Sequence, residues 1–299
     1  MPSFKSGIYA FVLKHTRKKS FTSVDGLKAR LENARKTEDF TPPPDLAEQV
    51  QISERRVGEM PVFEISPKNG KPQVRIIYLH GGAFLFEITA HHWKFIAKMA
   101  NRLNARFSVA IYPLAPETKA REMRAACMAH YEDVLGEKDH GPVMIMGDSA
   151  GGNLALVVSM MAAEMKIPVP AALVLISPPP DMTITNPDIA KVEKVDPWLA
   201  IPGLKLATEY YRGEEELSDW RISPTFGDIP ALPPMQIFIG TRDILHPDTL
   251  LFAEKVRNAG CRVDLVEEKG MFHVWPLLEI PEAFEARDKI ADFVAGIMK

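Results

Sequence analysis

Cysteine, net charge and long hydrophobic runs are all scarce in this sequence. Only two of its 299 residues are cysteines, Cys127 and Cys261. Neither has a partner at metal-ligand or redox spacing, so both are expected to be small buried side chains in a reducing compartment. The formal net charge of −3 supplies no basic field for nucleic acid. No segment reaches the run of about 18 apolar residues that a membrane span needs. These absences predict a cytoplasmic protein with no nucleic-acid partner and no membrane span.

The N-terminal segment does not have the order of a secretory signal. A short apolar run at residues 7–13 precedes the basic residues Lys14, Arg17, Lys18 and Lys19, whereas a signal carries its charges before the apolar run. We therefore interpret residues 1–20 as part of an amphipathic helix. It is expected to be an element of a cap, and an anchor on a membrane surface is the alternative.

Short apolar strands alternate with helical segments along most of the chain. Two alternating segments, Gln51–Val57 and Val62–Ser66, predict a hairpin at a sheet edge. The further predicted strands are Val74–Leu79, Arg106–Tyr112, Pro142–Met146, Ala171–Ile176, Met235–Ile239 and Arg262–Val266, and the predicted helices span about 90–104, 119–135, 153–165, 247–259 and 281–297. The alternation predicts an α/β fold with a mostly parallel sheet of about eight strands and helices on both faces.

Two segments do not follow this alternation. Residues 178–230 are rich in Pro, Asp, Trp and Tyr and helical only at about 200–212, and a stiff proline-rich break at 41–45 separates the N-terminal arm from the rest. We predict a main domain at 46–299 with a cap insertion at about 178–230, and an arm at 1–45 that completes the cap. Both would lie over the carboxyl ends of the strands, where open α/β sheets bind ligands.

A Gly-x-Ser-x-Gly pattern follows the strand at 142–146. In Gly147-Asp148-Ser149-Ala150-Gly151-Gly152 the serine would stand on a sharp strand-to-helix turn, the nucleophile elbow of serine hydrolases. The flanking glycines let the chain pass close to itself, and the helix that begins there offers free N–H groups to an anion. Ser149 is the predicted nucleophile. A glycine-rich turn without chemistry is the alternative on the local pattern.

A second glycine turn, His80-Gly81-Gly82-Ala83-Phe84, follows the strand at 74–79. Fixed backbone N–H groups on such a loop can stabilise the oxyanion of acyl transfer. We predict that the N–H groups of Gly82, Ala83 and Ala150 form this oxyanion hole and that Gly81 shapes the turn. Because alanine stands where a third glycine is common, we expect this position not to need a positive φ.

The acid and the base should follow the last two strands, in the hydrolase order Ser, Asp or Glu, His. Asp243 follows the strand that ends at Gly240, and His273 comes thirty residues later, after the next strand. Asp248 is the competing acid, but it follows Pro247 and is expected to serve the first turn of a helix. Ser149, Asp243 and His273 are therefore the predicted catalytic triad.

The other histidines are assigned no catalytic role. His91 and His92 begin a helix, yet adjacent residues do not share a helix face, and no carboxylate cluster accompanies them, so no metal site is predicted. The remaining ones are expected at the surface or at helix ends: His15, His130, His140 and His246.

The predicted oxyanion loop, nucleophile, acid and base follow one another in this order along the chain. With all four in place, the chain resembles the hormone-sensitive lipase family of carboxylesterases, the bacterial branch in particular, over about residues 74–299. Tyr112-Pro113-Leu114-Ala115-Pro116-Glu117 is similar to that family's Tyr-Arg-Leu-Ala-Pro-Glu segment, and Leu232-Pro233-Pro234 followed by Gly240-Thr241-Arg242-Asp243 to its approach to the acid. The departures are Ala83 for a glycine, Pro113 for arginine and Val274 for a glycine.

The resemblance implies an α/β-hydrolase fold with a helical cap and a serine carboxylesterase that hydrolyses short- to medium-chain esters through an acyl-enzyme. It also implies no cofactor and a small-molecule ester as the partner, with a homodimer left open. A lactonase, deacetylase or formamidase with the same triad is the alternative. Some members of this family are non-catalytic small-molecule receptors that have lost the catalytic histidine. Because His273 is present here, that reading is disfavoured. The predicted pocket residues, for which plain core packing is the alternative, are Phe84, Phe86, Trp198, Tyr210, Tyr211 and Trp275.

Overall fold

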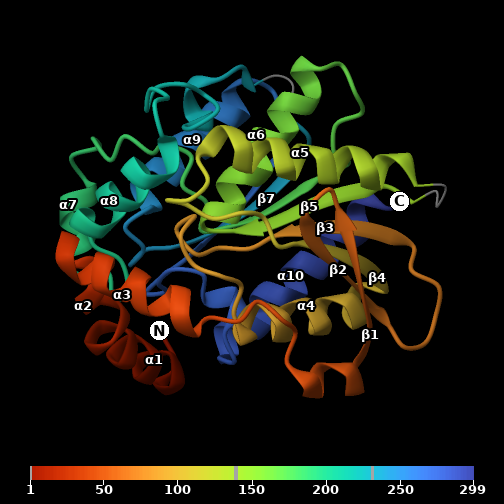
Figure 1. Ribbon diagram of the computed structural model, residues 1–299, viewed down its shortest axis with the longest axis horizontal. Coiled ribbons are helices and arrows are strands. Elements are labelled where there is room, and N and C mark those ends of the chain that lie inside the picture. Colours follow the sequence, from red (N-terminus) through yellow and green to blue (C-terminus); the bar gives the residue numbers. More distant parts are fainter. Residues whose placement is uncertain (1, 138–140, 230–231) are drawn as a thin grey trace.

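A computed structural model describes residues 2–137, 141–229 and 232–299, which form one eight-stranded sheet with helices on both faces (Figure 1). The strand order is β1-β2-β4-β3-β5-β6-β7-β8. β1 pairs with β2 and β2 with β4 antiparallel, and all other neighbours are parallel. The strands are β1 (Val50–Val57), β2 (Met60–Pro67), β3 (Val74–Leu79), β4 (Ala105–Ala110), β5 (Val143–Asp148), β6 (Leu173–Ile176), β7 (Met235–Gly240) and β8 (Val263–Glu268). The predicted mostly parallel sheet is confirmed.

The parallel strands are apolar along their length because helices cover both faces of the sheet. Every residue of β5, β6 and β7 is buried. In Figure 1, α4 and α10 lie on one face, and α5, α6 and α9 lie on the other. Their bounds are α4 (Ala90–Leu103), α5 (Ala120–Gly136), α6 (Ala150–Glu164), α9 (His246–Asn258) and α10 (Pro281–Ile297). All five were predicted, although α6 begins three residues earlier than expected, directly after Ser149.

The N-terminal arm and the insertion after β6 meet at one end of the sheet (Figure 1). Helices α2 (Arg17–Phe21) and α3 (Val24–Thr37) of the arm pack on α8 (Ile201–Arg212) of the insertion, which also holds α7 (Ile189–Glu193). The fit is close: a Cβ at Gly203 would lie 2.5 Å from the Phe21 ring. The predicted helix at 1–20 is two helices, since α1 (Phe4–His15) ends before Thr16.

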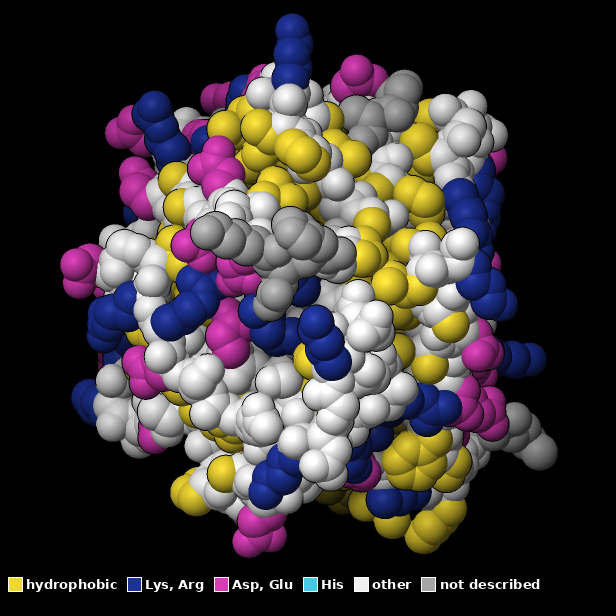
Figure 2. All heavy atoms as spheres, turned by 90° about the vertical axis from the view of Figure 1, so that its right-hand side faces the viewer, with side chains coloured by type: hydrophobic (Ala, Val, Ile, Leu, Met, Phe, Trp, Pro, Cys, Tyr) yellow, Lys and Arg dark blue, Asp and Glu magenta, His cyan; other side chains and the backbone are white. Residues whose placement is uncertain are grey.

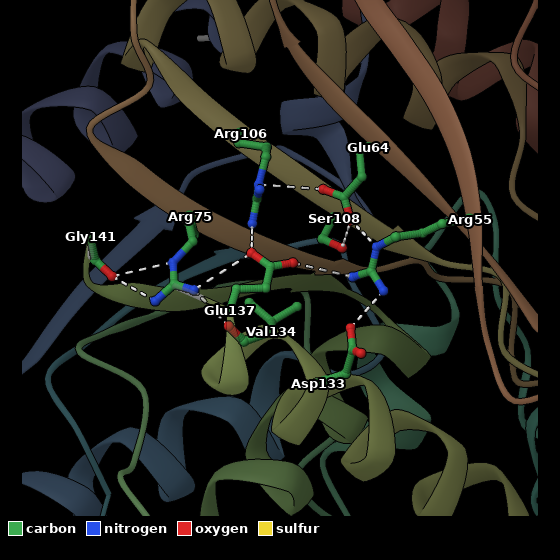
Figure 3. Close-up of polar contacts among 9 residues, drawn as sticks. All are labelled: Arg55, Glu64, Arg75, Arg106, Ser108, Asp133, Val134, Glu137 and Gly141. Carbon is green, nitrogen blue, oxygen red and sulfur yellow. Dashed lines mark hydrogen bonds and ion pairs between the residues drawn. The ribbon is translucent and has the colours of Figure 1, made fainter. Parts of the chain in front are cut away.

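Charged side chains tie the antiparallel edge of the sheet to α5 (Figure 3). Arg55 of β1 donates to Glu64 of β2 at 2.8 Å and to Asp133 of α5 at 2.5 Å. The cluster is completed by Arg75, Arg106, Ser108, Val134, Glu137 and Gly141. Glu64 and Arg75 are the members most withdrawn from water, at 13% and 12% side-chain exposure, so losing a partner there would leave a poorly solvated charge. The cluster is a structural feature of this edge and includes none of the predicted site residues.

The placement of His130 differs from the prediction. It was expected at the surface or as a cap, but it is fully buried in α5, and burial together with the nearby Arg55 lowers its pKa to about 4. It lies on the side of α5 that packs on the fold, a placement that its polar neighbours in sequence do not reveal. His15 is exposed, His246 begins α9 and contacts Glu267, and His140 lies outside the described residues.

The surface beside β1 carries charges of both signs. Figure 2 shows Lys and Arg side chains interspersed with Asp and Glu over this face, with hydrophobic side chains between them. A mixed face of this kind presents no field of one sign to a polyanion. Within residues 2–137, 141–229 and 232–299, no helix combines the length and the apolar character that crossing a bilayer requires.

Candidate active site

The turn between β5 and α6 holds Ser149 in strained backbone. Its φ is 49° and its ψ is −121°, a conformation that L-residues rarely adopt. The turn needs glycine on both sides of the serine. A Cβ at Gly147 would lie 2.4 Å from the Gly151 carbonyl oxygen, and one at Gly151 would lie 1.9 Å from the Leu79 carbonyl oxygen. The geometry therefore explains the Gly-x-Ser-x-Gly spacing and projects the serine hydroxyl beyond the end of the sheet.

Three side chains from separate loops are hydrogen-bonded in a row. Ser149 Oγ lies 2.9 Å from His273 Nε2, and His273 Nδ1 lies 2.9 Å from Asp243 Oδ2. A carboxylate only accepts, so Nδ1 carries the proton and Nε2 is left to accept from the serine hydroxyl. Asp243 is fully buried and His273 nearly so. The arrangement is the one required for a base that takes the serine proton while a carboxylate orients it.

The loop that carries His273 is anchored to the sheet by Val274. Its N–H donates to the Ser177 hydroxyl at 3.1 Å, just past the end of β6. Val274 has φ 48° and ψ 32°, the left-handed conformation that glycine adopts without a steric penalty. A β-branched residue in this region is strained, and the strain is held by the surrounding packing.

The glycine turn after β3 faces Ser149. Gly82 has φ 137°, Ala83 55° and Phe84 62°. The expectation that Ala83 would not need a positive φ is wrong: the loop folds back so tightly that the Phe86 and Leu85 N–H groups both donate to the Gly82 carbonyl. The N–H groups of Gly82, Ala83 and Ala150 have no acceptor in the described part of the chain. These three free donors are available to an anion beside Ser149.

Asp148 links this loop to the serine turn, a role that the sequence analysis missed. Its Oδ1 accepts from the Gly81 N–H at 3.0 Å and from the Tyr78 hydroxyl at 2.7 Å. Its Oδ2 lies 3.2 Å from His92 Nε2. Burial alone would raise the pKa of Asp148, but His92, Tyr78 and the Gly81 N–H lower it overall, so the carboxylate is ionised. The Gly81 N–H is therefore occupied and cannot bind an oxyanion.

The proton of His92 can be placed from its contacts. The Thr89 backbone N–H donates to His92 Nδ1 at 3.0 Å, and a backbone N–H cannot accept. Nε2 therefore carries the proton and donates to Asp148. The sequence signal was present, since His92 opens a helix three residues after Thr89, but its partner lies 56 positions away.

Comparison with known proteins then decides the family. A model of the alpha/beta hydrolase fold matches residues 76–277. The chain belongs to this family. An esterase of Acinetobacter venetianus is 31% identical over 255 residues, 83% of each chain. The structure of EstE5 soaked with p-nitrophenyl butyrate has a TM-score of 0.87 at 25% identity over 99% of both chains. A hormone-sensitive lipase from a metagenome library has a TM-score of 0.83 at 26% identity, over 97% of this chain and 98% of its own. The predicted resemblance to the hormone-sensitive lipase family is confirmed.

A cavity of about 710 Å³ opens over the serine of this α/β hydrolase. It is lined by Ser149, His273, the glycine turn and side chains of the N-terminal arm and of the insertion after β6. Of the six predicted pocket residues, Phe84, Phe86 and Trp198 line it. The Trp198 ring stands edge-on to His273, with centroids 5.7 Å apart. The arm contributes Tyr9, Leu13 and Phe21, which the sequence analysis did not name.

The other three predicted pocket residues do not line this cavity. Tyr211 is fully buried behind Phe84, with the two rings stacked 3.7 Å apart. Trp275 is fully buried against Phe238 of β7. Tyr210 is half-buried one position from Tyr211 on α8, and its carbonyl accepts from Lys119. The prediction was wrong for these residues because an aromatic side chain close to a cavity can pack in the core as readily as line the cavity.

Asp248 is placed away from His273. Its Oδ1 accepts from the Asn186 amide at 2.7 Å, and burial raises its pKa to about 6. The expected bond to the N–H groups of its own helix turn is absent from the described residues. The amide of Asn186, a residue of the insertion, donates to the carboxylate in place of those N–H groups. In the part of the chain that the structure describes, no three His, Cys, Asp or Glu side chains are grouped as a metal site would require.

Proposed function

We propose that this α/β hydrolase is a serine carboxylesterase that hydrolyses short- to medium-chain carboxylic esters through an acyl-enzyme. The observation that carries the proposal is the hydrogen-bonded row Ser149–His273–Asp243 beneath a cavity in which three backbone N–H groups are free. The family supports ester hydrolysis, because the chain is 31% identical to an esterase along 83% of its length. The cavity walls are mainly apolar side chains, which suits an acyl chain.

The proposed reaction begins when His273 Nε2 takes the Ser149 proton and Oγ attacks the ester carbonyl. The oxyanion is held by the N–H groups of Gly82, Ala83 and Ala150, in a site whose donors need no reorganisation. His273 then gives the proton to the departing alkoxide, and the alcohol leaves. Water, activated by the same imidazole, attacks the acyl-enzyme, and the acid product is released as Ser149 regains its proton.

The two cap segments are proposed to act as one cap, formed by the arm at 1–45 and the insertion at about 178–230. Both contribute side chains to the cavity wall, Phe21 from the arm and Trp198 from the insertion. A covering of this kind keeps bulk water from the bound ester.

Replacing Ser149 with alanine tests the proposal. The variant should fold as the parent does and should lose hydrolysis of p-nitrophenyl esters and labelling by a fluorophosphonate, because both need an activated serine. Rates over p-nitrophenyl esters of increasing acyl length would define the acyl preference. The parent protein could instead take the label, leave every such ester intact and cleave a lactone, an N-acetyl group or a formamide. In that case the protein would be assigned that reaction.

The pH dependence follows from the environment of His273. Burial would lower its pKa, but the Asp243 carboxylate and more distant acids outweigh burial and raise it above the usual 6.5. The base must be neutral, so kcat/KM should rise with pH through a midpoint above 6.5 and fall as pH drops below it. A profile that is flat from pH 5 to 9 would exclude a histidine base.

A further inference from the structure

Helix α1 exposes a continuous apolar strip. Phe4 is 87% exposed, Ile8 49% and Phe11 66%. These residues are spaced by four and three positions and therefore share one face of the helix, with His15 continuing the row. The opposite face, with Ser6 and Ala10, is buried against the fold. Large side chains at this exposure on one helix are unusual for a surface that only meets water.

The charge that residues 1–24 place around the strip is all of one sign, and Glu282 of α10 is a nearby acid, which accepts from Ser3 and Ser6 at the start of α1. Residues 1–24 contain five basic residues and no acidic one, although the whole chain has a net charge of −3. Lys5 and Lys14 stand on either side of the strip on the helical projection, and Arg17 and Lys19 follow on α2. These four are exposed and have no ion-pair partner among residues 2–137, 141–229 and 232–299. The face beside β1 is different, with both signs interspersed (Figure 2).

The same helix borders the cavity. Tyr9 and Leu13 line the cavity from the half-buried side of α1. Val12 lines it as well and is also 49% exposed, so it stands where the cavity wall meets the apolar strip. An apolar molecule bound along the strip would therefore lie beside one border of the cavity.

We propose that the strip Phe4–Ile8–Phe11 docks on an anionic phospholipid surface, with the flanking cations on the headgroups. An apolar helix face with basic borders lies in the plane of a membrane interface, and each side chain that enters the headgroup region adds to binding. The cations add attraction to anionic lipid, which weakens as salt increases. The docked helix places the border of the cavity at the lipid surface, from which esters can reach Ser149.

Sedimentation with vesicles tests the docking without any catalysis, so its result is independent of the proposed function. The full chain should bind vesicles containing phosphatidylglycerol, and bind them less at high salt and less on phosphatidylcholine alone. Phe4→Ser with Phe11→Ser should weaken binding about tenfold or more. Lys5→Gln with Lys14→Gln should reduce the preference for the anionic lipid, because Arg17 and Lys19 remain. Leu251→Ser on α9 is the matched control, since Leu251 is 58% exposed on a helix far from α1 in Figure 1.

The double phenylalanine variant should still hydrolyse soluble p-nitrophenyl acetate as the parent does, because neither side chain lines the cavity. Equal sedimentation of this variant and the parent, or no binding of the parent to anionic vesicles, overturns the proposal. If the parent is a dimer by light scattering and the variant a monomer, with neither binding lipid, the strip is covered by a second copy of the chain instead.

A separate observation concerns Asp196, a buried carboxylate of the insertion. Its Oδ2 accepts from the Ile244 N–H at 2.8 Å, directly after Asp243. Its Oδ1 accepts from the N–H groups of Trp198 at 2.6 Å and Leu199 at 2.9 Å. One side chain thus fixes the loop of the proposed acid and the start of the segment whose Trp198 ring borders His273.

We infer that Asp196 is a positioning residue that couples the cap to the proposed triad. Four charged or titratable groups face it or its loop. Asp243 and His273 interact with its charge, Lys18 of the arm donates to its carbonyl, and Arg242 donates to the neighbouring Val195 carbonyl. Burial and then Asp243 raise the pKa of Asp196 to about 6, and its charge helps to raise the pKa of His273.

Asp196→Asn should lower kcat about 10- to 100-fold, as expected for a shifted acid loop, with little change in KM. It should also move the acid limb of the kcat/KM profile to lower pH. Asp188→Asn, on an exposed acid of the same insertion, is the control and should change neither. Asp196→Ser, which shortens the side chain and keeps one oxygen, should show the same two effects. A loss of kcat with an unmoved acid limb, or failure of both Asp196 variants to fold, overturns the inference and leaves Asp196 a folding residue.

Discussion

Asp243→Asn is expected to lower kcat for a p-nitrophenyl ester by about 10³–10⁴-fold, as loss of the correct imidazole tautomer does in other serine hydrolases. The amide of asparagine can present a donor to His273 Nδ1, and the proton then moves to Nε2, where it blocks transfer from Ser149. The 2.9 Å contact between His273 Nδ1 and Asp243 Oδ2 is the geometric basis of this expectation. Steady-state kinetics on the purified variant measure it.

Asp248→Asn is the matched control for that experiment. Asp248 is a buried acid in the first turn of α9, five residues after Asp243, but its partner is the Asn186 amide, not His273. We expect kcat to change little and the free energy of unfolding to fall by at most about 1 kcal/mol. If the order of the two effects were reversed, Asp248 would be the acid and the contact with Asp243 would have no catalytic role.

Among the glycines of the serine turn, Gly151 is the one where replacement with alanine should lower the free energy of unfolding most. The new Cβ would lie 1.9 Å from the Leu79 carbonyl oxygen and 2.7 Å from that of His80, and both are backbone atoms that cannot rotate away. The added group forces β3 and α6 apart, at a cost of about 3 kcal/mol in the free energy of unfolding. It also moves the oxyanion loop away from Ser149, so the folded fraction should lose most of its activity.

Gly136→Ala serves as the comparison. Gly136 ends α5, and a Cβ there would meet no atom within 4 Å. The substitution should leave activity unchanged and raise the free energy of unfolding by up to about 1 kcal/mol, because alanine favours the helix. Urea denaturation of both variants gives the two values. Equal stability of the two variants would show that the turn can relax and that close approach does not explain the glycine.

Much of the fold could be predicted because its signals are local. Strands β5, β6 and β7 can each be recognised from an apolar run of a few residues, and the helices between them from their own short segments. The glycines around Ser149 indicate a tight backbone turn, because only glycine fits the close approaches there. Their place between a strand and a helix in the sequence locates that turn. The positions of Asp243 and His273 after the last two strands follow from strand order, since carboxyl ends of parallel strands share one edge.

The remaining features depend on which distant residues become neighbours. Three features illustrate this: the contact of His92 with Asp148, 56 positions away, the contact of Asn186 with Asp248, and the burial of His130. None of them produces a periodic pattern in the sequence. Aromatic residues illustrate the same limit: Phe84 and Tyr211 stack on each other, yet only Phe84 reaches the cavity.

The sequence by itself determined the strand and helix order, the family, and the serine, acid and base candidates, because each rests on backbone conformation or chain order. Tertiary structure alone decided that Ala83 adopts a positive φ, that Asp148 occupies the Gly81 N–H, and that α1 turns Phe4 and Phe11 outward. The physical reason is that a side chain's partners are set by the packing of whole elements. That packing sums many weak contacts over the chain, and no window of sequence contains them.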